Sequence, residues 1–564
     1  MNSIDIIRAG RESYYLSLGK DDYYTGHADP EGVFLGAGAK SLRILGQTIQ
    51  ERDPTLKNLF QGLSPDGKTE LRQGLATVRE YHTLRDPLTQ QTVRTESGKP
   101  LYLSRDEVAQ IQNGDANRYS DRLKSLSKTH QTDDFSAWLH TTERASVVAY
   151  DNVFSAPKDV SILWSLSPNE KDRETIVTLH QRATKAAISY LEEQAFIRTG
   201  KGGILSEPAR ATFAVFTHTT SRELDPQLHS HALMLNVGIT AEGKTGALDG
   251  KEILEARYAS GMIYQNELRR GLERHFGVET YDQPFSKGRG SSFGISGISE
   301  GIKEEFSRRT VEIRQRVDPG MTAKQKRAEV LKTRKEKDKN VDNAALLKEW
   351  QQRGKAQGFC WDKVVGKAKT KNISTEKEYR LLYREVAARL HASEQRGSVK
   401  DHTIVTSIAS AARGKLSTQD VHKIAAGFKT QFLKSHPQSN GKTLYTLNEK
   451  GFKAMQYRTI YERITDTLKG LKKAQVQNRL AILYATGKIS GAQYKKFTQG
   501  TGLPKSVIGI RTHQALGLIS KRQADYLVYK KRNPSPPQPP KHRDTPITRV
   551  SVFENSPSKK GYER

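Results

Sequence analysis

Residues 217–237, THTTSRELDPQLHSHALMLNV, decide the fold of this chain and carry its most specific chemistry. The stretch holds the end of one strand-like run, a ten-residue connector, TTSRELDPQL, and a second apolar run. Within the connector, Asp225-Pro226 supplies the residue types that form turns. We therefore expect the two runs to lie antiparallel, which would bring His218, at the end of the first run, beside the second.

Two further histidines, His229 and His231, are separated by one residue in the second run. Side chains two apart in a strand point to the same face, so both imidazoles can bind one ion, with His218 as a third ligand. Three neutral imidazoles leave a divalent ion its full charge and open positions at which a phosphodiester oxygen can be polarised. The alternative is that these are ordinary core or surface histidines. A single histidine would favour that alternative, whereas three histidines in this spacing favour a metal site. The pattern predicts a metal site.

Outward from this stretch, the first 300 residues have a mixed α/β pattern. Strand-like runs occur at 147–154 (VVAYDNVF) and 211–217 (ATFAVFT), besides 228–237. Residues 172–193 predict an amphipathic helix, because apolar side chains recur at helical spacing. Its apolar stripe consists of Ile176, Leu179, Ala183, Ala187, Tyr190 and Leu191.

The last part of the chain predicts short helices and then a tail. Residues 375–531 contain a weak repeat, GKLSTQDVHKI (414–424), GKISGAQYKKF (487–497) and GLISKRQADYL (517–527). Ser490 with Gln493 fits a capping box, in which two side chains satisfy each other's backbone donors at a helix start, and Ser520 with Gln523 fits another. From residue 533 the chain is polar, basic and proline-rich, which predicts disorder.

Composition restricts the class of protein. Among 564 residues, 92 are Lys or Arg and 62 are Asp or Glu, for a formal net charge of +30. A chain this basic usually meets a polyanion, and nucleic acid is the first candidate, although charged faces on a soluble protein are the simpler alternative. A single cysteine, Cys360, excludes an internal disulfide framework and cysteine-based metal sites. With no signal peptide pattern and no apolar run long enough to span a bilayer, we expect no membrane insertion and a cytoplasmic location.

Two tyrosine pairs lie near the start of the chain, Tyr14-Tyr15 and Tyr23-Tyr24. A tyrosine hydroxyl can attack phosphorus, but its pKa near 10 makes it a weak nucleophile without a base or a metal. Adjacent residues of a helix point about 100° apart, so only one of each pair can face a site. Tyrosine pairs more often pack a core or stack on bases, so the pairs alone are weak evidence.

Two other motifs bear on catalysis. Asp151, in the run 147–154, could take a proton from a tyrosine or orient a ligand imidazole, and the alternative is a capping or surface aspartate. GITAEGKT (238–245) satisfies the phosphate-loop pattern G-x-x-x-x-G-K-T, which requires a following helix. Because glycines follow instead, we interpret this segment as a hairpin turn after the histidine strand and expect no nucleotide cofactor.

Taken together, these segments resemble the MobF-type conjugative relaxases of the HUH endonuclease superfamily, which nick one strand at a plasmid's origin of transfer. The resemblance covers about residues 1–365. It rests on SYYLSLGKDDYY (13–24), YDNVFSAPKDVS (150–161), the histidine stretch 217–237, and TRKEKDKN followed by LLKEW (333–350). It implies an antiparallel sheet flanked by helices, an α+β domain with the site on the open face of the sheet, followed here by a mostly α-helical C-terminal region.

The resemblance also implies roles for residues. Tyr14 would be the nucleophile of nicking and Tyr23 a candidate for a second strand transfer, with Tyr15 and Tyr24 as possible additions. Asp151 would be the general base. His218, His229 and His231 would hold Mg²⁺ or Mn²⁺, with Zn²⁺ or Ni²⁺ as alternatives, and Arg222 and Lys158 would contact DNA phosphates. The implied partners are single-stranded DNA at the origin of transfer, relaxosome accessory proteins and a type IV secretion coupling protein.

The chain departs from the family pattern in two respects. The stretch of about 71–149 is longer than expected and is interpreted as an insertion, and the chain ends too soon for the C-terminal helicase of large members. We therefore predict a relaxase domain over 1–365, a helical accessory domain over 366–532 and a disordered basic tail over 533–564, which could accompany DNA into a recipient cell. Three alternatives stay open: a rolling-circle replication initiator, a metal-dependent phosphodiesterase that uses water, and a DNA-binding module without chemistry.

Overall fold

The computed structural model describes residues 2–17, 32–72, 77–199, 205–221, 223–284, 291–317, 320–322, 325, 329, 342–367, 372–395, 399–438, 443–457, 473–487, 489–498, 507–515, 518–519 and 521–532. The chain divides into two compact units, Met1–Met455 and Gln456–Arg564. The first unit contains the sheet and the histidine stretch, and the second contains only helices among its described residues.

An antiparallel sheet organises the first unit, with strand order β1-β6-β10-β9-β2-β3 and β11 paired to β10. The strands are β1 (Asn2–Arg8), β2 (Gly32–Leu35), β3 (Thr48–Ile49), β6 (Val147–Ser155), β9 (Arg210–Thr220), β10 (Pro226–Ile239) and β11 (Thr245–Gly246). The strands expected at 147–154, 211–217 and 228–237 are therefore confirmed as β6, β9 and β10. The predicted α+β fold with an antiparallel sheet is confirmed as well.

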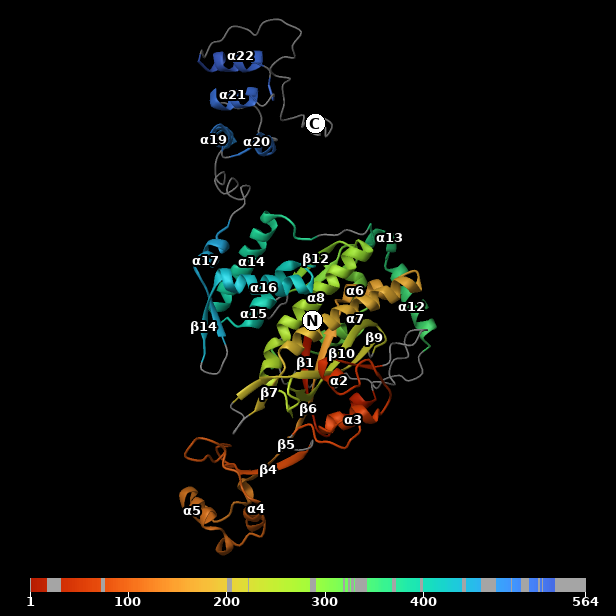
Figure 1. The fold of residues 1–564 in the computed structure, drawn as a ribbon, viewed down its shortest axis with the longest axis vertical. Helices are drawn as coiled ribbons and strands as arrows, with labels where there is room; N and C mark the ends of the chain where they lie inside the picture. The colour runs from red at the N-terminus through yellow and green to blue at the C-terminus, as the bar shows by residue number, and fades with distance from the viewer. Residues whose placement is uncertain are drawn as a thin grey trace. The chain divides into compact units, whose positions relative to one another are not determined.

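Alternating side chains give the sheet two apolar faces. One face, which includes Phe213 and Met234, packs against the long helices α7 (Glu170–Glu193) and α8 (Gly250–Phe276) (Figure 1). The other face, which includes Phe216 and Leu233, packs against α3 (Pro54–Gln61). Because α3 is short, it covers only part of this face, and the histidine end of β9 and β10 lies on this side.

Local sequence explains where these elements begin and end. The predicted helix at 172–193 is confirmed as α7, which starts where the Asn169 side chain accepts a hydrogen bond from the Asp172 amide. Residues 238–245 form the β10–β11 hairpin, in which Ile239 pairs with Thr245. Gly243 sits in its turn with a φ of 82°, a conformation that favours glycine. The hairpin interpretation of the phosphate-loop pattern is thus confirmed.

The stretch predicted as an insertion forms a lobe with its own small core. Its strands β4 (Val78–Leu84) and β5 (Leu139–Ala145) pair, and α4 (Arg105–Gln112) and α5 (Asp121–His130) lie between them in the chain. Leu84, Ile111, Leu123 and Phe135 are fully buried together. The ends of the lobe meet, because the Ser146 amide donates to the Thr77 carbonyl over 2.9 Å.

Smaller elements complete the first unit. The two-stranded pairs are β7 (Phe196–Thr199) with β8 (Leu205–Pro208), β12 (Thr280–Pro284) with β13 (Ser291–Ile295), and β14 (Leu433–Pro437) with β15 (Thr443–Leu447). The remaining helices are α1 (Ser13–Leu16), α2 (Ala37–Ser41), α6 (Lys158–Ser165), α9 (Glu300–Glu305), α10 (Arg308–Arg316), α12 (Asn343–Ala356), α13 (Trp361–Val364), α14 (Glu376–Glu394), α15 (Asp401–Ala412), α16 (Thr418–Phe432) and α17 (Glu449–Met455).

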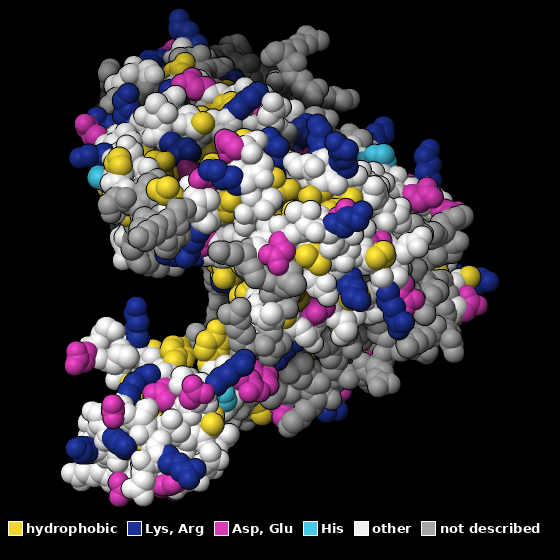
Figure 2. Space-filling model, turned by 60° about the horizontal axis from the view of Figure 1, so that its bottom comes forward, with side chains coloured by type: hydrophobic (Ala, Val, Ile, Leu, Met, Phe, Trp, Pro, Cys, Tyr) yellow, Lys and Arg dark blue, Asp and Glu magenta, His cyan; other side chains and the backbone are white. Residues whose placement is uncertain are grey.

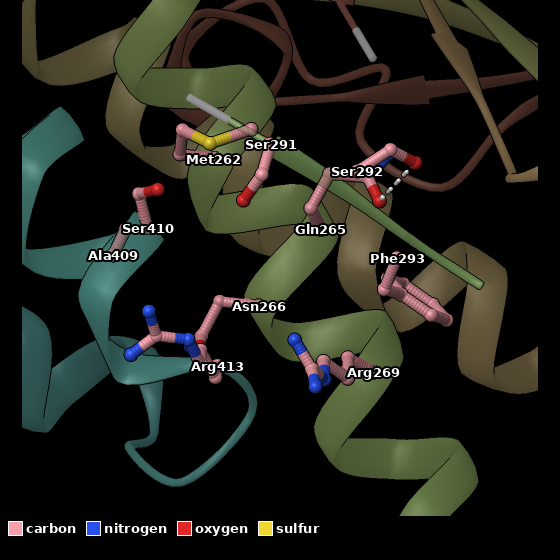
Figure 3. Close-up of a pocket in the computed structure, with 10 residues that line it drawn as sticks. All are labelled: Met262, Gln265, Asn266, Arg269, Ser291, Ser292, Phe293, Ala409, Ser410 and Arg413. Carbon is pink, nitrogen blue, oxygen red and sulfur yellow. Dashed lines mark hydrogen bonds between the residues drawn. The ribbon is translucent and has the colours of Figure 1, made fainter. Parts of the chain in front are cut away.

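Helices α14, α15 and α16 share the core of the sheet's helical face, so the first unit continues well past residue 365. Figure 3 shows Asn266 and Arg269 of α8 facing Arg413 at the end of α15. Asn266 donates to the Leu416 carbonyl over 2.8 Å and accepts from the Gly414 amide over 2.8 Å. Helices after residue 365 therefore pack in the same core as the residues before it. The domain boundary predicted at residue 365 stays a prediction.

Replacing Asn266 by alanine is expected to lower the free energy of unfolding by about 1–3 kcal/mol, because two backbone groups of the 414–416 turn lose their buried partner. Urea unfolding would measure the loss, and amide exchange should rise first in α15 and α16. Gln419→Ala, which removes an exposed amide from α16, is the matched control. An Asn266→Ala protein as stable as this control would contradict the expected role of the Asn266 contacts.

Basic side chains are spread over the surface. Figure 2 shows Lys and Arg over most of the face in view, intermingled with fewer Asp and Glu. This distribution accords with the net charge of +30. Among the described residues, no helix combines the length and apolarity needed to cross a membrane.

Candidate active site

The pairing of β9 with β10 brings three histidines together. His229 lies directly opposite His218 in the register, and His231 follows two residues along the same strand. The three ring centroids are 5.2–5.4 Å apart, and one ring nitrogen from each residue lies within 4.8 Å of the others. The predicted convergence of His218 on the other two histidines is therefore present in the fold.

Hydrogen bonds orient two of these imidazoles. His231 places Nδ1 2.9 Å from Asp151 Oδ2, and His229 places Nδ1 2.8 Å from the Gln227 carbonyl. A ring nitrogen that donates to a carboxylate or a carbonyl leaves the opposite nitrogen, Nε2, available as a ligand. Three imidazoles on one sheet face, two of them oriented by these hydrogen bonds, fit a divalent metal ion.

Tyr15 contacts this group in the structure. Its hydroxyl donates to Asp151 Oδ2 over 3.1 Å, and its ring lies 6.5 Å from that of His231. Burial and the negative charge of Asp151 raise the pKa of Tyr15 well above its usual value, so the hydroxyl stays protonated at neutral pH. Tyr14 packs edge-on against Tyr15 at 5.1 Å in the same short helix, α1.

Asp5 is a second carboxylate on this face that the sequence analysis did not identify. It lies on β1 directly opposite Asp151 of β6, and its charge also raises the pKa of Tyr15. Residues directly opposite in antiparallel strands share a face, so Asp5 and Asp151 both point to the side of the histidines. Strand alternation in residues 2–8 is the sequence signal that could have located Asp5.

A buried polar network lies behind the histidine strand. Ser230, between His229 and His231, points to the opposite face, where its hydroxyl is 2.8 Å from His180 Nε2 and 2.9 Å from the Thr217 hydroxyl. His180 Nδ1 in turn lies 2.8 Å from the Tyr264 hydroxyl. Complete burial lowers the pKa of His180 to about 3, so its ring is neutral. His180 follows Ile176 by four residues, so it lies on the predicted apolar stripe of the helix. This spacing is the sequence signal that could have identified His180 as a buried residue.

The connector between the two histidine strands is held by the helices that follow the sheet. Asp225, which is buried, accepts hydrogen bonds from the Arg308 amide and Nε, both over 2.9 Å. Trp350 Nε1 donates to the Leu224 carbonyl over 2.9 Å. These contacts join α10 and α12 to the loop that precedes His229, so the geometry of the ligands depends on residues far along the chain.

Of the predicted phosphate-contacting residues, Lys158 is described by the structure. Its Nζ donates to the Pro226 carbonyl over 2.8 Å, and burial lowers its pKa to about 8 despite the nearby charge of Asp225. Arg222, Tyr23 and Tyr24 lie outside the described residues. The Pro226 carbonyl takes one of the three N–H donors of the Lys158 ammonium group, and a DNA contact by this residue stays a prediction.

Replacing Asp151 by asparagine is expected to weaken Mn²⁺ binding about 10- to 100-fold. Loss of a residue that hydrogen-bonds a metal-binding imidazole typically lowers metal affinity by that factor. The amide removes the negative charge that makes the His231 ring a stronger donor to a metal. Calorimetric titration with Mn²⁺ measures the change. Asp5→Asn removes one charge from the same face without touching His231, so an equal loss in both variants would contradict an orienting role for Asp151.

Comparison with known proteins identifies the family. The family model described as TrwC relaxase matches residues 8–357. The Multifunctional conjugation protein TraI of Escherichia coli is 33% identical over 223 residues, which cover 37% of this chain and 12% of that protein. TraI of Escherichia coli strain K12 is 30% identical over 223 residues, with the same coverage, so the chain spans only a small part of both relatives.

Solved structures include the conjugative relaxase TrwC in complex with oriT DNA in a metal-bound form. The two chains are 24% identical, and the alignment covers 64% of this chain and 100% of the TrwC chain, with a TM-score of 0.44. The four segments on which the predicted resemblance rests all lie within the residues that the family model matches. The resemblance to the MobF-type relaxases is thus confirmed, and the chain belongs to the TrwC relaxase family.

Proposed function

We propose that this protein nicks one strand of DNA at a plasmid origin of transfer and later rejoins it, and so initiates conjugative transfer. The observation that carries the proposal is the grouping of a tyrosine hydroxyl, a carboxylate and three imidazoles on one face of the sheet. Family membership and the conjugation function in the name of the TraI relatives support the choice of an origin of transfer as substrate.

The proposed reaction is a transesterification. A tyrosine oxygen attacks the scissile phosphorus and forms a phosphotyrosyl bond to the 5′ side, while the bond from phosphorus to the 3′ oxygen breaks. The tyrosine proton passes to a carboxylate, and the departing 3′ oxygen takes up a proton to become a hydroxyl. Because one phosphodiester replaces another, the reverse reaction rejoins the strand without ATP.

The chain's residues divide this work among them. Asp151 is the proposed general base, and its hydrogen bond from the Tyr15 hydroxyl supports this role by placing a carboxylate within reach of α1. His218, His229 and His231 would hold a divalent ion, which when bound polarises the phosphodiester oxygens. Imidazole ligands suit Mn²⁺, Zn²⁺ or Ni²⁺, and the supply in the cell favours Mg²⁺ or Mn²⁺. Arg222 and Lys158 are proposed to meet phosphates, and Tyr23 and Tyr24 to serve a second strand transfer.

We propose Tyr14 as the nucleophile and Tyr15 as its anchor. The hydroxyl of Tyr15 is half-buried, bonded to Asp151 and kept protonated by its raised pKa, which makes it a poor nucleophile in this conformation. The proposed role of this hydrogen bond is to hold α1 against the sheet, so that Tyr14 can reach the scissile phosphate. The competing assignment makes Tyr15 the nucleophile with Asp151 as its base, and phenylalanine variants of the two tyrosines separate these assignments.

Accessory interactions are proposed from the resemblance. Relaxosome accessory proteins and a type IV secretion coupling protein would bind outside the sheet, with the helical residues 366–532 as the candidate surface. The tail, 533–564, lies outside the described residues, and we propose that it aids export with the DNA into the recipient.

A nicking assay tests the proposed reaction. Purified protein, Mn²⁺ or Mg²⁺, and end-labelled single strands tiled across the DNA beside its own gene are resolved on a denaturing gel. A strand-specific label that migrates with the protein supports tyrosine transesterification and locates the site. Cleavage without an adduct would favour the phosphodiesterase that uses water. Loss of plasmid replication, rather than transfer, on deletion would favour the replication initiator.

A further inference from the structure

The second unit is far more basic than the rest of the chain. Residues 473–532 contain twelve Lys or Arg and one acidic residue, Asp525, whereas the whole chain contains 92 basic and 62 acidic residues. The only acid is itself neutralised, because Asp525 Oδ1 lies 2.6 Å from Arg511 NH1. The positive charge of this segment therefore has no acidic counterpart within it, and a polyanion is the natural partner.

This basic segment is folded rather than an extended tail. It consists of α19 (Lys473–Ala485), α20 (Gly491–Thr498), α21 (Val507–Ala515) and α22 (Lys521–Arg532), which Figure 1 labels. Leu480, Ala481 and Tyr494 are fully buried in one small core, and Ile510, Ile519, Ala524 and Val528 form a second. The basic side chains are thus carried on a packed helical scaffold.

The weak sequence repeat corresponds to a helix–turn–helix corner. Between α19 and α20, Gly487 adopts a φ of 67°, and Ser490 and Gln493 exchange hydrogen bonds over 2.8 and 3.3 Å at the start of the second helix. The capping box predicted there is confirmed. Between α15 and α16, Gly414 has a φ of 78°, and Ser417 and Asp420 form the same box.

The copies of this corner differ in their surroundings. In the first unit, α16 docks on protein, because the Thr418 hydroxyl donates to Glu267 over 3.3 Å and His422 lies 3.6 Å from Glu193. In the second unit, Arg479 of α19 and Lys521 of α22 are exposed. Both corners thus pack through buried side chains, and the helices of the second unit also expose cations.

We propose that helices α19, α20, α21 and α22 form a second DNA-binding site, which binds the phosphate backbone of duplex DNA. A helix–turn–helix corner is suited to a duplex, since its second helix fits the major groove while its first crosses the backbone. Single-strand binders instead present exposed aromatic side chains, whereas among the aromatic side chains described in this segment Tyr494 is buried against His513 and Tyr484 is half-buried. The inference does not depend on the nicking reaction, and it would let the protein stay on duplex DNA beside the strand that it cuts.

Duplex binding by the full chain tests the inference. Binding to a labelled duplex that lacks the DNA beside its own gene is measured without metal, between about 0.05 and 0.2 M salt. The variant carries Arg479→Gln, Lys495→Gln and Lys521→Gln. If all three residues contact phosphates, the slope of log affinity against log salt falls in magnitude by about 2.7, and affinity at 0.15 M salt falls roughly 100-fold.

Two matched variants make the result specific. Arg105→Gln, Lys124→Gln and Lys128→Gln remove the same charge from exposed positions of α4 and α5, and duplex binding is expected to change little. Arg479→Lys, Lys495→Arg and Lys521→Arg keep the charge and should retain binding, which separates lost contacts from misfolding. Nicking of a short single strand should be equal in all three proteins. Unchanged duplex binding in the first variant, or an equal loss in the α4 and α5 variant, would overturn the inference and point to a protein partner instead.

Discussion

Replacing Tyr14 by phenylalanine is expected to abolish the covalent protein–DNA adduct and to lower nicking by at least about 10³-fold, since removal of a nucleophile eliminates the covalent route. The change deletes one oxygen and leaves the aromatic ring to pack edge-on against Tyr15. Binding of the single strand should therefore survive, and the loss should appear in the rate of adduct formation. Labelled oligonucleotide on a denaturing gel measures that rate.

Tyr15→Phe is the matched variant, because it deletes the same atom one residue later. It removes the 3.1 Å hydrogen bond to Asp151 and frees that carboxylate to act on Tyr14. The adduct should still form, at a rate lowered by about tenfold through looser placement of α1, a modest effect for a residue that acts through another. An adduct lost in Tyr15→Phe and kept in Tyr14→Phe would assign the nucleophile to Tyr15, with Asp151 as its base.

The sheet and the ligand cluster could be predicted from the sequence because strand alternation is a local property. The spacing of His229 and His231 alone predicts that they share a face of their strand. The short connector predicts that the strand carrying His218 pairs antiparallel with it. The stripe from Ile176 to Leu191 likewise required only a helical period. Family resemblance added the roles of residues, which spacing could not supply.

The contacts that escaped prediction join residues far apart in the chain. Asp5 faces Asp151 only because β1 pairs with β6, and His180 reaches Ser230 only because α7 crosses the back of β10. The packing of α15 on α8 likewise depends on Asn266, whose partners lie some 150 positions later. Local pattern carries no information about which distant elements meet, so these contacts required the fold.

Removing one metal ligand is expected to be almost as damaging as removing the nucleophile. His231→Ala should weaken Mn²⁺ binding and lower nicking by at least about 100-fold, because a direct ligand contributes more than its outer partner, whose loss already costs 10- to 100-fold. Metal content of the purified protein and nicking at fixed Mn²⁺ concentration measure the two effects. Treatment of the wild-type protein with a chelator should reproduce the loss, and added Mn²⁺ should reverse it.

The pattern across variants distinguishes a ligand from its outer partner. Excess Mn²⁺ should restore metal binding in the Asp151→Asn variant, because its three imidazoles remain. The His231→Ala variant should still bind Mn²⁺ poorly, because two imidazoles hold the ion weakly. His82→Ala, on strand β4 of the lobe, removes an imidazole far from the cluster in sequence and should match the wild type. If His231→Ala nicked at the wild-type rate with a chelator present, the imidazoles would be structural, and the tyrosine would have to act with Asp151 alone.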